Sequence, residues 1–289
     1  MWPPWDTVKK LEQPHMSICI YPHFHKPFPY NEKSDWIKPC HVDKVDIGKN
    51  SIFIDWIYDD FYKYYEAEGV SKDDFLKAFG QQATEYWLLK EQPEVDNIGC
   101  NTYRRMLSFK QDVPVYNGNL YKIFPYFNDF NLPADRALDL GTEDERRTIL
   151  HFMSCVDVIT NKSTYLNCSV SEQYLQSQPV EYWNLFHKAI LELNYDQESL
   201  LWFEQNRVPF TTTYIFKKEY FLKYSSELFQ ILEYIYKNCS KVYPTKQSGD
   251  TFSEPFPWRY PGFIGERFLG FFIHANSLSK MEVPLIFLE

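Results

Sequence analysis

The sequence predicts an α/β fold, most simply a single domain with one mixed sheet flanked by helices. Three observations predict it. Short apolar runs alternate with amphipathic segments along the chain, no internal repeat or low-complexity tract interrupts them, and the 289 residues are 44% hydrophobic and 24% charged. A chain of this length can bury a sizeable core, so disordered and fibrous classes are excluded.

The first half of the chain contains an arm, three strands and a helix. Residues 1–16 hold three prolines and two tryptophans, and we expect an N-terminal arm there and the domain at 17–289. The apolar run at 17–21 predicts a strand that ends where Pro22 removes a ladder donor. Periodicity then predicts strands at 51–58 and 95–100, and one helix at 73–90.

The second half begins with long loops and ends in a strand. Residues 109–140 are rich in Pro, Asn, Asp and Tyr, which favours loops. Helical spacing and β-branched or aromatic runs predict the remaining elements: helices at 143–152, 179–193, 218–237 and 263–274, and strands at 210–216 and 283–288.

Composition narrows the choice of partners. The net charge of −9 argues against broad capture of nucleic acid or of an anionic membrane. No run of about 18 apolar residues predicts a transmembrane helix, and the first residues lack the order of a secretory signal. Six scattered cysteines without a C-x-x-C pair fit buried thiols in a reducing cytoplasm. The 19% of aromatic residues fits a bulky core or stacking surfaces for ligands.

Two histidines at the end of the first strand are candidate ligand contacts. His23 and His25 alternate around Phe24, so both face one side of an extended segment. With His41 and Asp43 they could form a zinc site, which would make the chain a metal-dependent hydrolase. Hydrogen bonding or contact with an organic ligand is the alternative.

A pair of arginines follows the third predicted strand. Arg104 and Arg105 each offer a planar fork of donors, which suits a phosphate clamp at the end of a strand. The alternative is a surface pair that forms salt bridges with acids of this acidic chain.

Glu266 lies among apolar residues near a predicted helix start. Partial burial would raise the pKa of such a carboxyl and suit it to general-base catalysis. A glutamate that only interacts with the helix dipole is the alternative. The sequence contains no G-x-G-x-x-G, P-loop, G-x-S-x-G or H-E-x-x-H motif. It also lacks the strict Asp-x-Asp with which many transferases that use sugar nucleotides hold a divalent cation.

Several segments, in this order, resemble a bacterial family known as domain of unknown function 4422, which is associated with glycosyltransferases of capsule and lipopolysaccharide synthesis. The resemblance spans roughly residues 17–288. It rests on seven elements: Ile18 to Pro27, Thr84-Glu85-Tyr86-Trp87, Asn97-Ile98-Gly99-Cys100, Thr102-Tyr103-Arg104-Arg105, Glu172-Gln173-Tyr174, an aromatic helix from Tyr220 to Tyr236, and Arg259 followed by Gly262 to Arg267. The chain departs from the family pattern at Thr102, where the family has histidine, and at Gln81-Gln82, where we expect a carboxylate.

The resemblance implies a GT-A-like, Rossmann-like fold and transfer of a sugar from a UDP- or GDP-linked donor. The acceptor would be a glycan or a lipid-linked molecule, so the chain would work in the cytoplasm, with peripheral association at the inner membrane as one option. We do not firmly expect a cofactor. A role for Mn²⁺ or Mg²⁺ remains an alternative, although the sequence has no Asp-x-Asp motif to hold the ion. We expect Glu266 to act as the base of an inverting, metal-independent reaction. The expected donor contacts are Arg104, Arg105, Arg259, Arg267, Tyr103, His23, His25 and Tyr21.

A second hypothesis comes from another class of function. The same fold could serve as a non-catalytic carbohydrate-binding or assembly protein, with aromatic side chains that stack on sugars. The missing family histidine at Thr102 would then mark lost chemistry.

Overall fold

The structure is a computed structural model. It describes residues 16–24, 34–41, 51–54, 59–102, 105–109, 130–132, 141–240 and 259–288. The strands are β1 (Ile18–Phe24), β2 (Cys40–His41), β3 (Ile52–Phe53), β4 (Asn97–Thr102), β5 (Arg105–Leu107), β6 (Phe130–Leu132), β7 (Val158–Asn161), β8 (Thr164–Tyr165), β9 (Arg207–Val208), β10 (Tyr214–Lys217), β11 (Lys280–Val283) and β12 (Leu285–Leu288). The helices are α2 (Asp59–Ala67), α3 (Lys72–Phe79), α4 (Gln81–Glu91), α6 (Glu143–Met153), α7 (Val170–Leu175), α8 (Val180–Glu192), the 3₁₀ helix η2 (Ser199–Glu204), α9 (Lys218–Asn238) and α10 (Tyr260–Ala275).

One mixed sheet forms the centre of the fold, as the alternation of strands and helices predicts. Its strand order is β11-β7-β10-β4-β1-β2-β3. β10 runs antiparallel to both of its neighbours, whereas β11–β7, β4–β1, β1–β2 and β2–β3 pair in parallel. β12 continues from β11 and joins β5 and β6, and β8 and β9 form a separate two-stranded antiparallel sheet.

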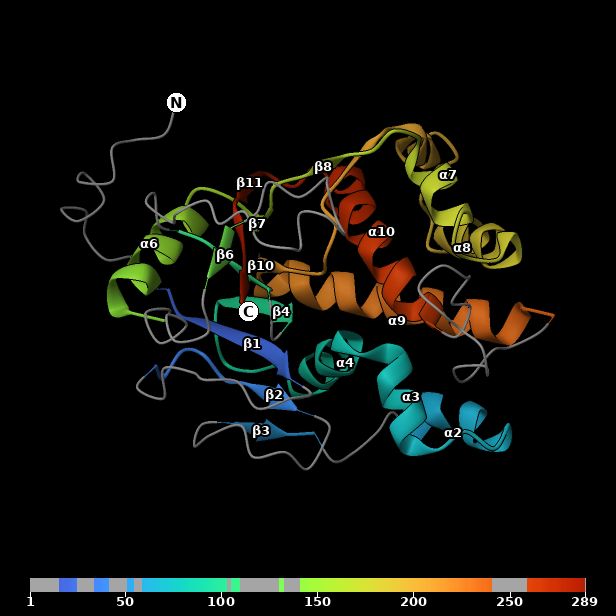
Figure 1. Cartoon of the computed structure of the whole chain (residues 1–289), viewed down its shortest axis with the longest axis horizontal. Helices are drawn as coiled ribbons and strands as arrows, with labels where there is room; N and C mark the ends of the chain where they lie inside the picture. The colour runs from blue at the N-terminus through green and yellow to red at the C-terminus, as the bar shows by residue number, and fades with distance from the viewer. Residues whose placement is uncertain are drawn as a thin grey trace.

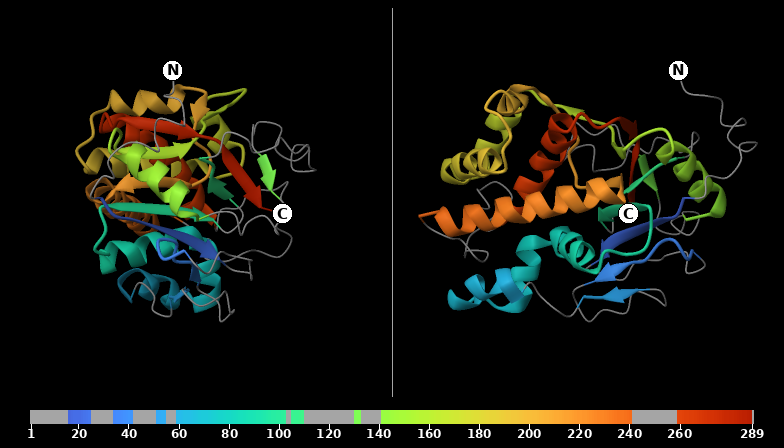
Figure 2. Two further views of the ribbon diagram at one scale, coloured as in Figure 1. Left: turned by 90° about the vertical axis from the view of Figure 1, so that its left-hand side faces the viewer. Right: turned by 180° about the vertical axis from the view of Figure 1, so that it is seen from behind.

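Helices cover both faces of the sheet, and each face has its own core. In Figure 1, α6 lies on one side of the strands, and α2–α4 and α7–α10 lie on the other. Figure 2 shows α9 running lengthwise between α4 below and α8 and α10 above. The larger core lies between the sheet and the helices α3, α4 and α8–α10, and is rich in aromatic side chains such as Phe186, Tyr224 and Phe268. The smaller core on the α6 side contains aliphatic side chains such as Ile20 and Ile149.

The first strand runs three residues further than the sequence predicts, straight through Pro22. The amide of Ile20 donates to Trp36 O, so the nitrogen of Pro22, two residues on, faces the same side of β1. There the ladder toward β2 is interrupted between Ile37 and Cys40. The absent N–H of proline therefore falls in a gap, and the strand continues to Phe24.

The expected helix at 73–90 is two helices, α3 and α4. Gly80 separates them with φ +54°, a backbone conformation that other residues rarely adopt. The chain turns there while the apolar periodicity continues on both sides. The expected strand at 51–58 is confined to β3 within the described residues, and residues 55–58 lie outside them.

The cysteines are free thiols, but not all of them are buried. Cys19, Cys40 and Cys100 lie in the core, whereas Cys155 is exposed. Burial raises the pKa of the Cys19 thiol to about 11. The expectation of six buried thiols is therefore wrong for the second half of the chain. None of the described helices is long and apolar enough to span a lipid bilayer.

Candidate functional site

The parallel strands β1, β4 and β7 end at the same edge of the sheet. Register aligns His23 of β1 with Thr102 of β4. Antiparallel β10 starts at this edge, because Tyr214 pairs with both Cys100 and Thr160. Ligands of open α/β sheets bind outside the carboxyl ends of the parallel strands. This strand edge is therefore the candidate site.

Polar side chains replace apolar ones where these strands end. Asn101, Thr160, Asn161 and Thr213 are 0–3% exposed. Asn101 Oδ1 and Thr160 Oγ1 have no hydrogen-bond partner within the described part of the chain. A buried polar atom without a partner costs about 1–3 kcal/mol, so residues of this kind are unusual in purely structural strand ends.

The turn that leads into β10 is strained. Thr211 has φ +75°, which is a true outlier for a β-branched residue. Its Oγ1 lies 3.3 Å from Thr213 Oγ1 and 3.4 Å from Asn161 Oδ1, and hydrogen bonding to these atoms holds the turn against the end of β7. Backbone strain of this kind concentrates at functional sites.

A buried carboxyl lies behind the strand edge. Glu85 of α4 is 0% exposed, and its Oε1 accepts from the Tyr214 hydroxyl at 2.7 Å and from Gln81 Nε2 at 3.4 Å. Gln81 in turn bonds to Thr212, whose hydroxyl donates to Gln81 Oε1 at 2.9 Å. Burial raises the pKa of Glu85 to about 7, against the lowering effect of the two hydrogen bonds. Near neutral pH this carboxyl can therefore hold or release a proton.

The same helix fixes the first strand and meets α10. Thr84 Oγ1 lies 3.0 Å from His23 Nδ1, and both side chains are buried. Gln82 lies so close to Gly265 of α10 that a Cβ there would stand 2.5 Å from Gln82 Nε2. The segment from Gln81 to Glu85 thus connects β1, β10 and α10.

Glu266 and Arg267 form an ion pair on α10. Arg267 Nη1 donates to Glu266 Oε2 at 2.9 Å and to Phe263 O at 3.1 Å, and Nη2 donates to Gln173 of α7. The side chain of Arg267 is 1% exposed, whereas that of Glu266 is 28% exposed. The guanidinium lies 5.3 Å from the Phe210 ring centroid, a favourable cation–π distance. Arg267 therefore orients a carboxylate that solvent reaches.

The two carboxyl groups belong to one region. Tyr224 of α9 donates to Gly265 O at 3.4 Å, next to Glu266. After the dominant effect of burial, the charges of Glu85, Cys100 and Glu266 all raise the pKa of the Tyr224 hydroxyl. This residue therefore lies within electrostatic range of both carboxylates.

The expected donor contacts fall into three groups. Tyr103, Arg104 and His25 lie outside the described residues. Arg105 is half-buried and pairs with Thr102 across the hairpin between β4 and β5, which places it beside the strand edge. Arg259 is exposed at the residue that precedes α10.

Tyr21 and Arg267, also expected to contact the donor, lie inside the protein. Tyr21 is 1% exposed and packs edge-on against Trp87 with 6.2 Å between ring centroids. Arg267 is engaged on α7 and α10 as described above. Their burial favours structural and positioning roles over direct contact with a donor.

Groups that could hold a metal are absent from the described residues: these contain no cluster of three His, Cys, Asp or Glu side chains suited to a metal ion. Of the four residues of the zinc hypothesis, His25 and Asp43 lie outside the described part. His23 bonds to Thr84, and His41 packs on Phe53 with ring centroids 5.2 Å apart.

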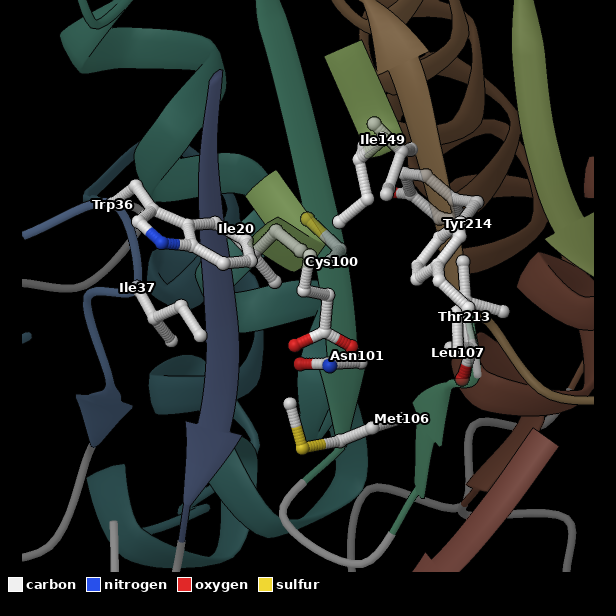
Figure 3. Close-up of a pocket in the computed structure, with 13 residues that line it drawn as sticks. Ile20, Trp36, Ile37, Cys100, Asn101, Met106, Leu107, Ile149, Thr213 and Tyr214 are labelled. Atoms are coloured by element: carbon white, nitrogen blue, oxygen red, sulfur yellow. The ribbon is translucent and has the colours of Figure 1, made fainter. Parts of the chain in front are cut away.

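A small cavity lies on the α6 side of the strand edge (Figure 3). Its volume is about 10 Å³, which suits a single water molecule and no substrate. Asn101, Thr213 and Glu145 supply its polar lining among apolar side chains such as Ile20 and Trp36. The strand ends are thus closely packed on this side.

Sequence reasoning missed Glu85, Gln81 and the Thr211–Thr213 turn as parts of the site. One signal was available: Glu85 and Gln81 are polar residues four apart on a short helix that also contains Trp87 and Leu88, and the fold buries both. The hydroxyl of Tyr214 that meets Glu85 is 129 residues away in sequence. No local pattern predicts this contact.

Comparisons with known proteins agree with this architecture. The structure is similar to the apo structure of the WbbM bifunctional glycosyltransferase, with a TM-score of 0.64, 19% sequence identity and 94% of this chain covered. The chain spans 45% of that protein. The likeness shows a glycosyltransferase fold, which confirms the predicted fold. The sequence matches no curated protein at a significant level.

The sequence itself gives the family. Residues 19–277 match the description "Domain of unknown function (DUF4422)", and this range includes the strand edge, α4 and α10. The chain therefore belongs to the DUF4422 family.

Proposed function

We propose that the chain is a glycosyltransferase that moves a sugar from a UDP- or GDP-linked donor to a glycan or lipid-linked acceptor in surface polysaccharide synthesis. The observation that carries this proposal is the Glu266–Arg267 pair, beside a polar strand edge in a glycosyltransferase fold. A lipid-linked acceptor would bring the chain to the cytoplasmic surface of the membrane.

Glu266 acts as the general base. It accepts the proton of the acceptor hydroxyl, whose oxygen attacks the anomeric carbon. The bond from that carbon to the diphosphate oxygen breaks, and its electron pair leaves with the nucleoside diphosphate. Partial exposure of Glu266 leaves room for an acceptor, and the bond from Arg267 fixes the carboxylate.

The arginines after β4 neutralise the leaving diphosphate. Arg105 stands at the end of β4, where transferases with an Asp-x-Asp hold their cation, and Arg104 precedes it in the sequence. Fixed positive charges aimed at a leaving group stabilise the transition state without reorganisation. In this proposal Arg259 adds charge at the N-terminus of α10, His25 and Tyr103 contact the nucleotide, and the buried His23, bonded to Thr84, positions the end of β1.

The test is donor binding and turnover with and without a chelator. We expect UDP or GDP to raise the melting temperature, and hydrolysis of the matching nucleotide sugar to persist in excess EDTA. Loss of turnover with EDTA and its return with Mn²⁺ would contradict charge neutralisation by arginine. The same result would still support a glycosyltransferase. Stabilisation by glycans but by no nucleotide would favour the non-catalytic binding protein instead.

Replacement of the base is the second part of this test. We expect Glu266→Gln to lower donor turnover by about 10²–10⁴-fold, because the amide cannot accept the proton. Glu192→Gln, on the exposed end of α8, is the matched control and should keep the wild-type rate. A rate for Glu266→Gln within about threefold of wild type would remove this residue as the base.

A further inference from the structure

A second hollow lies between the C-terminal half of α10, the β8–β9 strand pair and β11. Its volume is about 410 Å³, within the range of ligand pockets. Figure 1 shows the end of α10 close to β8 and β11. Its lining includes Ser163, Trp202, Arg207, Gly270, His274 and Lys280. We call this hollow the α10 groove.

An indole ring is held firmly in the α10 groove. Trp202 lies against the backbone of α10 at Gly270, where a Cβ would stand 2.5 Å from Cη2 and 2.6 Å from Cζ2. The rings of Phe203 and Phe271 flank the indole edge-on, with centroids 5.2 Å and 6.4 Å away. Trp202 stays partly exposed. A fixed, partly exposed aromatic ring offers an apolar face at little entropic cost, which suits the C–H face of a sugar.

The groove is cationic although the chain is acidic. Arg207 and Lys280 are 44% and 43% exposed, and no Asp or Glu is among the described residues that line it. Both cations pair with Glu282, at 2.5 Å and 2.9 Å, so one positive charge remains uncompensated by the acids of the described residues. Only Nη2 of Arg207 is engaged there, and no acceptor in the described part of the chain meets its Nε or Nη1. These donors favour an anionic group over a neutral one.

The groove adjoins the strand edge through three chain segments. Ser163 follows Asn161 by two residues, and Pro209, which also lines the groove, precedes Thr211 by two. On α10, Gly270 follows Glu266 by four residues, about 6 Å along the helix axis. One end of an oligosaccharide bound in the groove would therefore lie close to Glu266, the candidate base.

We infer that the α10 groove binds an anionic oligosaccharide, with a sugar ring against Trp202 and a carboxylate or phosphate substituent at Arg207 and Lys280. Its role as the acceptor chain rests on the proposed function, whereas the binding itself does not. The inference thus names the acceptor class as a negatively charged glycan.

The experiment is a binding titration with the full chain. The probes are an oligogalacturonate, a phosphorylated oligosaccharide, a neutral maltooligosaccharide of the same length and inorganic phosphate. We expect one of the acidic sugars to bind at least 10-fold more tightly than the neutral one, with a Kd that rises with salt. The double variant Arg207→Gln, Lys280→Gln should raise that Kd at least 10-fold, and Trp202→Leu should also weaken binding. Arg147→Gln on α6, exposed and ion-paired to a similar extent, is the control and should stay within twofold.

The two acidic probes show whether the anionic substituent is a carboxylate or a phosphate. Equal affinity for the neutral sugar, an unchanged Kd in the double variant, or full competition by inorganic phosphate alone would each overturn the inference. If Trp202→Leu fails to fold, Trp202→Phe and the double variant still decide. The thermal shift by UDP or GDP reports on the strand edge separately, so failure of the groove and failure of the proposed function are distinguishable.

Discussion

Glu85 is a carboxyl group that the fold buries without a cation to balance it among the described residues. Its Oε1 accepts two hydrogen bonds and its Oε2 has no partner there, which is why burial outweighs the hydrogen bonds and the pKa rises from 4.5 to about 7. At the residue scale, this makes Glu85 the clearest source of a pH-dependent property near the candidate site.

The folded state prefers protonated Glu85, whereas the unfolded chain ionises it above pH 4.5. The resulting stability is therefore complete below about pH 4.5 and is lost as pH rises to about 7. We expect Glu85→Gln to be more stable than the wild type at pH 8, and this advantage to shrink by up to about 3 kcal/mol toward pH 5.

Urea unfolding of both proteins between pH 5 and 8 checks this expectation. Glu192→Gln, which replaces an exposed carboxylate, should follow the wild type at every pH. Parallel curves for the wild type and Glu85→Gln would show that the carboxyl does not titrate in this range.

At the scale of the element, α10 matters most, because it carries the candidate base and one wall of the α10 groove. Its glycines differ in what surrounds them. Gly270 touches the Trp202 ring and Gly265 touches Gln82, whereas no atom of the described residues lies within 4 Å of a Cβ at Gly262. At Gly265 and Gly270 the missing side chain lets Gln82 and Trp202 approach the backbone of α10 closely.

This difference gives a matched pair of substitutions within one helix. Gly270→Ala forces a rigid indole away and should destabilise the protein by about 1–3 kcal/mol. Gly262→Ala meets no obstacle and should stabilise it by up to about 1 kcal/mol through helix propensity. Urea unfolding measures both, and a change of the same sign and size in the two variants would show that propensity, not packing, governs α10.

At the scale of the whole molecule, one sheet separates two cores. Ile215 of β10 packs in the α6-side core, while its neighbours Tyr214 and Phe216 pack in the aromatic core. Neither core can open without exposing strands that the other needs. We therefore propose that residues 17–289 form a single domain, as the sequence predicts.

A single domain should unfold as one cooperative unit. We expect the urea transitions followed by tryptophan fluorescence and by far-ultraviolet circular dichroism to coincide, with one midpoint. Trp36 lies in the α6-side core and Trp183 in the aromatic core, so fluorescence samples both faces of the sheet. Two separated midpoints would show that the faces unfold independently and would contradict the single domain.

The sequence alone determined the fold class and the positions of α6, α8, α9 and α10, because hydrophobic periodicity is a local property. The role of Glu266 stays a prediction. Sequence-based prediction of element bounds was wrong where contacts between distant segments, or a turn at a single residue, changed the local pattern. Pro22 lies inside β1 because the adjoining ladder has a gap there, and Gly80 divides one expected helix into two.

Only the tertiary structure decided which polar groups meet. It joined Glu85 to Tyr214, Arg267 to Gln173, and Arg207 to Glu282, which stand 129, 94 and 75 residues apart. It also buried Tyr21 and Arg267, which the sequence placed at the donor. The physical reason is that burial and hydrogen bonding depend on which surfaces the sheet and helices bring together, and this is set by packing across the whole chain.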